Sequence, residues 1–276
     1  SSGRPRHTLK SMTNRASAAT SPPAAARAGR PPPAGGRRRR RPGWVPNQHG
    51  AWAMLVTPLL VGVIAGGPAW VDIPLTVTWF VGYFAFFATG LWLKSGRKAR
   101  YAPPVRAYAV AAALAGVVTL VMRPEIVRWA PLFVVPLGVG LVASAQRRDR
   151  ALVSGLATSV GSSLMTLVAY DVGGGTDWRR AWLLTAVLAA YFAGTVLYVK
   201  TMIRERDSEP HYWLSVGFHA VVTLALIPFS PALVLVFAVL TIRAAMAPSF
   251  ALSPRAVGIG EAVATVVVAV TALVTL

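Results

Sequence analysis

Two short segments carry most of the side chains suited to binding an anion. Residues 89–100 read TGLWLKSGRKAR and residues 195–206 read TVLYVKTMIRER, with Thr, Leu, Lys and Arg identical at matching positions. Each segment lies where a long apolar run gives way to a basic loop. The repeat indicates two halves that face one shared site, although apolar-then-basic sequence is also the ordinary cytoplasmic end of a membrane helix.

If both segments are helical, Lys94 and Lys98 share one helix face and Lys200 and Arg204 share another, because each pair is four residues apart. Lys and Arg side chains are good partners for phosphate. These four residues therefore suggest a phosphate or another anionic head group as ligand. The alternative is that they only supply the positive charge of cytoplasmic loops, with local pairing to acids.

A second polar group lies at the start of the first apolar run, where the sequence contains Gln48, His49 and Trp52. His49 is expected at the same membrane level as both basic segments, and an imidazole can act as acid, base or ligand near neutral pH. We expect these three residues to line a cavity, together with Tyr198 from the second basic segment.

Histidine also occurs in the seventh apolar run, where His211, Ser215 and His219 are four residues apart. His219 is expected to face the interior of the bundle or the same cavity. Because Ser215 occupies the middle position, no two histidines lie one helical turn apart. The sequence therefore predicts no metal site.

Glu261 is the only acid inside an apolar run, and Arg243 lies near the same membrane level in the preceding run. A charge within lipid is costly unless it has a partner. The sequence predicts a structural ion pair between these two residues, with a proton relay as the alternative.

The elements that position these residues are membrane helices. The chain has 276 residues, 55% of them hydrophobic and only 13% charged, whereas soluble domains carry roughly 25% charged residues. With spans of roughly 20 residues, the length suits about nine. The predicted fold class is all-α, a polytopic membrane helical bundle. Its apolar runs are residues 49–66, 73–93, 105–122, 129–145, 151–170, 180–199, 212–229, 231–247 and 256–276.

Charge sets the expected orientation. Outside the first 43 residues, nine spans place thirteen Lys and Arg residues on one side of the membrane and four on the other. Basic loops remain cytoplasmic, so we expect a plasma-membrane protein with its N-terminus inside and its C-terminus outside. The cationic loops are short and lack interleaved aromatics, so the net charge of +19 does not indicate nucleic-acid binding.

Two domains are expected. Residues 1–43 hold eleven Lys and Arg residues and no acid, among many Pro, Ala and Gly residues, a composition typical of a disordered tail. An arm that binds anionic lipid and an organelle transit peptide are alternatives. Residues 44–276 form the membrane domain. The absence of cysteine excludes disulfides and thiol catalysis.

The first apolar run begins Pro46-Asn47-Gln48-His49-Gly50-Ala51-Trp52-Ala53-Met54-Leu55. This motif, together with the segment around Tyr198 and Lys200, resembles the YwiC-like family of bacterial integral membrane proteins. That family is distantly similar to UbiA-type prenyltransferases, which implies two four-helix halves and a ninth helix around a central cavity. UbiA-type enzymes hold Mg²⁺ with aspartate motifs at the places where this chain has its two basic segments.

Here those aspartate motifs are missing. Magnesium requires oxygen ligands, so Mg²⁺ binding of that kind is not expected, no cofactor is predicted, and enzymatic activity stays open. The function that this resemblance and the basic segments suggest is binding of an isoprenoid or other anionic lipid in a cavity open to the cytoplasm, with membrane lipids as partners. A transporter or accessory protein without covalent chemistry, and a divergent prenyltransferase, are the alternatives. The oligomeric state is not indicated.

Overall fold

The computed structural model describes residues 43–46, 51–250 and 252–276, and these residues form one compact unit. The described chain contains α-helices, short 3-10 turns and no strands. Gln48, His49 and the proposed tail lie outside the described residues, apart from Gly43. The helices are α1 (Ala51–Gly66), α2 (Asp72–Lys94), α3 (Ala102–Met122), α4 (Ala130–Ala145), α5 (Leu152–Ser163), α6 (Met165–Val172), α7 (Trp178–Ile203), α8 (Glu209–Ala225), α9 (Pro231–Met246) and α10 (Pro254–Thr275).

The predicted fold class, an all-α membrane bundle, is confirmed. Seven helical segments of the described chain are long and apolar enough to cross a membrane. The fifth of the predicted runs is divided at Leu164 into α5 and α6, which count together as one of these segments. Helix α1 is apolar but has 16 residues, and α8 has 17. The expected number of nine crossings therefore stays a prediction.

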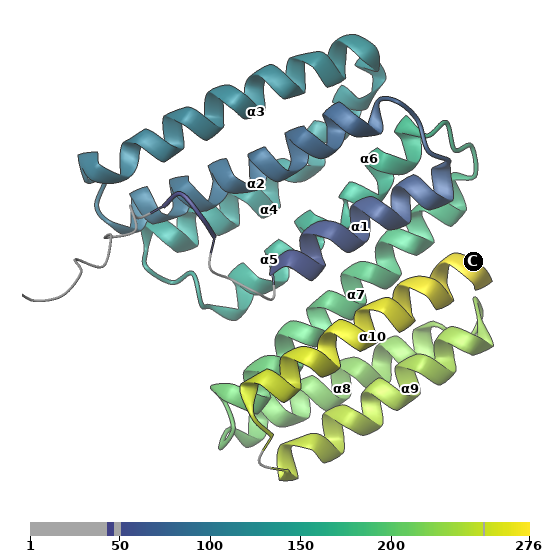
Figure 1. Ribbon diagram of the computed structural model, residues 1–276. Coiled ribbons are helices and arrows are strands. Elements are labelled where there is room, and N and C mark those ends of the chain that lie inside the picture. Colours follow the sequence, from purple (N-terminus) through teal and green to yellow (C-terminus); the bar gives the residue numbers. More distant parts are fainter. Residues whose placement is uncertain (1–42, 47–50, 251) are drawn as a thin grey trace, which may run out of the picture. The chain divides into compact units, whose positions relative to one another are not determined.

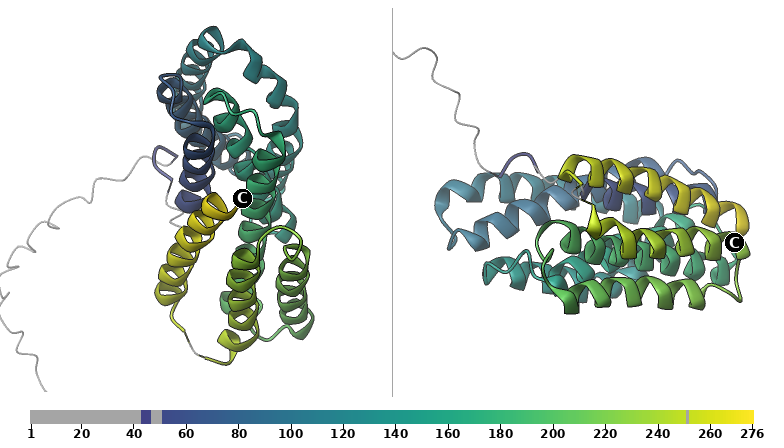
Figure 2. Two further views of the ribbon diagram at one scale, coloured as in Figure 1. Left: turned by 90° about the vertical axis from the view of Figure 1, so that its right-hand side faces the viewer. Right: turned by 90° about the horizontal axis from the view of Figure 1, so that it is seen from below.

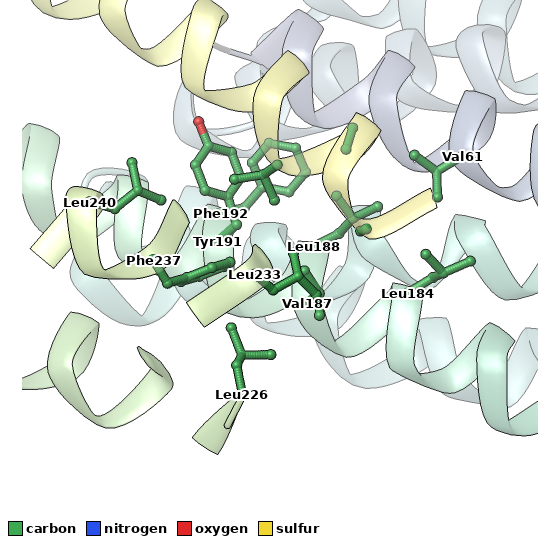
Figure 3. Close-up of a cluster of buried hydrophobic side chains, with 13 residues drawn as sticks. Val61, Leu184, Val187, Leu188, Tyr191, Phe192, Leu226, Leu233, Phe237 and Leu240 are labelled. Carbon is green, nitrogen blue, oxygen red and sulfur yellow. The ribbon is translucent and has the colours of Figure 1, made fainter. Parts of the chain in front are cut away.

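Helix α7 lies in the middle of the unit. It packs against α1, α5 and α6 on one side and against α8 and α10 on the other. Figure 1 shows α2, α3 and α4 beyond the first group and α9 beyond the second, and the left view of Figure 2 shows the same order from the side. A cluster of buried side chains from α1, α7, α9 and α10 forms the largest part of the core, including Leu188, Phe192 and Phe237 (Figure 3).

Small residues allow the inner helices to approach one another closely. A Cβ atom on Gly62 of α1 would lie 2.5 Å from the carbonyl oxygen of Thr166 in α6. On α5, a Cβ on Gly155 would meet Val196 of α7 at 2.8 Å, and Ser159 and Ser163 are fully buried. In lipid, where apolar burial alone does not drive association, such faces permit tight van der Waals packing.

Candidate functional site

The two basic segments end their helices differently. Gly96 follows the end of α2 with a φ of 75°, and Arg97 has a φ of 61°. Glycine adopts this left-handed conformation without a steric penalty, so α2 stops at Lys94. Met202 takes the matching position in the second segment and is buried, and α7 continues to Ile203.

This difference corrects one expectation. Lys98 does not share a helix face with Lys94, because the three turn residues 95–97 separate it from the end of α2. Lys98 is exposed and has an extended backbone. The corresponding spacing of Lys200 and Arg204 does remain helical, since Arg204 is the C-cap of α7.

Lys94 is paired with an acid from another loop. Its ammonium group donates hydrogen bonds to both carboxylate oxygens of Asp149, at 2.8 and 3.0 Å. Arg147 also donates from Nε to the Lys94 carbonyl oxygen at 3.3 Å, so two contacts hold the α4–α5 loop against the end of α2. Burial alone would raise the pKa of Asp149, but the hydrogen bond from Lys94 and the charges of Lys94 and Arg150 bring that pKa below its ordinary value.

Asp149 connects the two basic segments. It lines a cavity of about 110 Å³ with Lys94, and also a neighbouring cavity of about 240 Å³ with Lys200 and Arg204. Lys200 has its own partner, because its Nζ lies 3.8 Å from Glu205 Oε1. The first copy of the repeat therefore lines one cavity, the second copy lines the other, and the Asp149 carboxylate lines both. We call these two spaces the basic cavities.

An apolar cavity adjoins the basic ones. It has a volume of about 330 Å³ and lies among α1, α2, α4 and α5. Tyr83, Phe86 and Thr158 line both this space and the 110 Å³ cavity. The Tyr83 hydroxyl is buried without a hydrogen-bond partner, which is unfavourable unless water or a ligand supplies one. These shared residues place the charged cavity and the apolar cavity side by side.

Trp52 lies beside this region, in the first turn of α1. Its ring is 6.2 Å from the rings of Phe80 and Phe84 and 6.5 Å from Tyr83, all on α2. Trp52 does not line the apolar cavity directly, but Met54 and Leu55 from the same helix do.

The remaining predicted residues form a separate cluster among α7, α8, α9 and α10. Arg243 Nη1 lies 2.5 Å from Glu261 Oε1, and the guanidinium lies 4.1 Å from the centre of the Tyr198 ring. Thr195 donates to Glu261 Oε2 at 2.7 Å. Tyr198 therefore belongs with the Arg243–Glu261 pair, and not with the basic cavities where its sequence neighbour Lys200 lies.

His219 is buried in α8, in the same part of the bundle. Its Nδ1 lies 2.7 Å from the carbonyl oxygen of Ser215, one turn earlier. A carbonyl oxygen only accepts, so Nδ1 carries the hydrogen and the ring has a structural contact. A Cβ on Gly194 of α7 would lie 2.9 Å from the other ring nitrogen, which shows how closely α7 and α8 approach here.

Sequence reasoning missed two parts of the structure. Asp149 was the first, although one acid among three cations in the segment Arg147–Arg150 could have drawn attention to it. The second is a clamp at the opposite end of the bundle. There Arg128 lies 2.7 Å from Asp171, and Trp129 donates to the same carboxylate at 2.8 Å. Among the described residues, no three His, Asp or Glu side chains gather where they could hold a metal ion.

The apolar helices and the helical fold define a multi-pass integral membrane protein. The pattern of the YwiC-like protein family matches residues 45–170. The uncharacterised protein YwiC of Bacillus subtilis is 31% identical over 190 residues, which are 68% of this chain and 77% of that protein. The chain therefore belongs to the YwiC-like family, as its first motif indicated.

A second relative covers more of the chain. An uncharacterised protein of Haemophilus influenzae is 26% identical over 224 residues, which are 81% of this chain and 94% of that protein. No solved structure matches the chain. The similarity to UbiA-type enzymes thus stays an expectation from sequence.

Proposed function

We propose that this protein binds an anionic lipid, a phospholipid or an isoprenoid phosphate, at the cytoplasmic side of the plasma membrane. The head group would occupy the basic cavities beside Lys94, Lys200 and Arg204. The hydrocarbon chain of the lipid would extend into the apolar cavity. The observation that carries this proposal is that the 110 Å³ cavity beside Lys94 and the apolar cavity share three lining residues, Tyr83, Phe86 and Thr158.

The sizes and positions of the cavities suit an amphiphile. Binding sites for small molecules are mostly apolar with a few polar groups that fix orientation, and here the polar groups are at one end. An anion beside partly buried cations interacts more strongly than it would in bulk water. The basic end is assigned to the cytoplasm because thirteen of the seventeen cations outside the tail belong to its loops. The N-terminus is accordingly inside and the C-terminus outside.

The test is mass spectrometry of the lipids that co-purify with the protein. We expect one anionic lipid species in near-stoichiometric amount with the wild type, and its loss from the double variant Lys94→Gln, Lys200→Gln. The control is Arg148→Gln, because Arg148 is exposed, lies in the same loop as Asp149 and lines neither basic cavity. Arg147 is unsuitable, since it contacts Lys94.

Two results would oppose the proposal. Equal lipid content in the double variant and in Arg148→Gln would show that only general positive charge matters. Bulk membrane lipid without selectivity in the wild type would favour the alternative of a transporter or accessory protein that does not retain lipid.

A further inference from the structure

Asp149 occupies the position that a bound anion would take beside Lys94. Both of its oxygens accept from the Lys94 ammonium, and the same carboxylate borders the cavity that contains Lys200 and Arg204. A head group that enters must either share Lys94 with Asp149 or displace it. The pair can separate, because the Lys94 and Asp149 side chains are 41% and 30% exposed.

The charge balance of the basic cavities indicates the charge of the head group. Four cations line the two cavities, against the shared carboxylate and the carboxylate paired with Lys200, which leaves two positive charges. A phosphomonoester carries nearly two negative charges above its second pKa of about 6. A phosphodiester carries one. The cations are Lys94, Arg150, Lys200 and Arg204, and the carboxylates are Asp149 and Glu205.

We propose that the basic cavities select a dianionic phosphate head group over a singly charged phosphodiester, and that this head group competes with Asp149 for Lys94. The inference rests on the proposed function and adds the class of ligand and an internal competitor. It assigns Asp149 a role opposite to that of the surrounding cations, because removal of the Asp149 charge should strengthen binding of the head group.

The experiment uses the full chain in phosphatidylcholine nanodiscs at pH 8, titrated with short-chain phosphatidic acid, short-chain phosphatidylglycerol or inorganic phosphate. The wild type should bind phosphatidic acid on the order of tenfold more tightly than phosphatidylglycerol, the effect of one further charge-assisted hydrogen bond. Asp149→Asn should raise the affinity for phosphatidic acid roughly threefold, and that for phosphatidylglycerol less, since repulsion scales with ligand charge.

Asp207→Asn is the matched control, since it removes the same charge from an exposed residue that lines neither basic cavity. Equal affinity of the wild type for both lipids would overturn the dianion assignment. Weaker binding by Asp149→Asn, or the same change as in Asp207→Asn, would show that Asp149 only holds the loop in place and would overturn its role as competitor.

Failure of the proposed function itself has different signatures. Inorganic phosphate that binds as tightly as phosphatidic acid would support the dianionic ligand but remove the lipid. If Lys94→Gln, Lys200→Gln and Arg204→Gln all leave every affinity unchanged, the basic cavities are not the binding site, and both proposals are overturned.

Discussion

The protein contains two ion pairs that differ in their surroundings. Lys94–Asp149 joins the end of α2 to a loop, and both partners border cavities. Arg243–Glu261 joins α9 to α10 within the bundle, and neither residue lines the basic cavities or the apolar cavity. Glu261 also accepts from Thr195, and Arg243 stacks on Tyr198.

This difference separates an exchangeable contact from a structural one. A partly exposed pair contributes little to stability, about 0–1 kcal/mol, and can give up a partner to a ligand. A buried pair cannot lose one charge without leaving the other unpaired in apolar surroundings. Arg243 Nε and Nη2 are already buried without hydrogen-bond partners, so its guanidinium depends strongly on Glu261.

The largest effect is expected when the buried pair is broken. Glu261→Ala should lower the free energy of unfolding by about 3–5 kcal/mol, because it leaves the Arg243 charge without a counter-ion. Thermal unfolding in detergent measures this. Glu205→Ala, which breaks the partly exposed pair with Lys200, should change the stability by at most about 1 kcal/mol.

A double variant makes this comparison sharper. Arg243→Met combined with Glu261→Gln removes both charges and keeps an acceptor for Thr195. Most of the lost stability should return. If the double variant is as unstable as Glu261→Ala, charge pairing is not what Glu261 provides.

The second effect concerns the apolar cavity. Gly82 lines this cavity, and a Cβ added there meets no atom within 4 Å. Gly82→Leu should therefore fill the space without a clash and lower the amount of bound lipid on the order of tenfold, about 1.4 kcal/mol. Gly217→Leu on α8 is the matched control, since its Cβ is equally free and it lies outside the cavity. If Gly82→Leu retains as much lipid as Gly217→Leu, the hydrocarbon chain of the lipid does not occupy this cavity.

A smaller effect is expected at Tyr83. Its hydroxyl has no hydrogen-bond partner among the described residues, so Tyr83→Phe should leave the melting temperature unchanged or slightly higher. If the hydroxyl contacts the ligand, lipid affinity should fall roughly fivefold, about 1 kcal/mol. Titration of both proteins with the same lipid measures the change. An unchanged affinity would remove Tyr83 from the site.

The smallest effect is the dependence on pH. The pKa of Asp149 is lower in the folded protein than its unfolded value of about 3.9. The contribution of the Lys94–Asp149 pair to stability is therefore fully present above that value and is lost as the pH falls through the lower, folded pKa. The difference in melting temperature between the wild type and Asp149→Asn should stay constant from pH 8 to 5. A difference that disappears within this range would contradict the assigned pairing.

The sequence predicts the fold well because long apolar runs bounded by charges leave few alternatives. Each of the nine predicted runs coincides with a helix or, for residues 151–170, with α5 and α6 together. The ion pair between Arg243 and Glu261 could be predicted because few charged residues lie within those runs. The division of residues 44–276 into two four-helix halves and a ninth helix stays a prediction.

The site was less accessible to sequence reasoning. Helical spacing was applied past Gly96, whose left-handed backbone ends α2 and separates Lys98 from Lys94. The acid that pairs with Lys94 was also not foreseen, since Asp149 reaches Lys94 across 55 residues of sequence. The cavities depend on how α1, α2, α4 and α5 pack, which no local pattern specifies.

The central claim is that one ligand spans the basic and apolar cavities, and photo-crosslinking tests it most directly. The probe is phosphatidic acid with a diazirine near the end of its acyl chain, bound to the protein in phosphatidylcholine nanodiscs. Labelled peptides should concentrate in residues 133–141 and 157–162, which contain the α4 and α5 residues that line the apolar cavity, and unlabelled phosphatidic acid should suppress the labelling. Labelling that falls mainly on α3, whose residues are mostly exposed on the outside of the bundle, and that resists competition would contradict the claim.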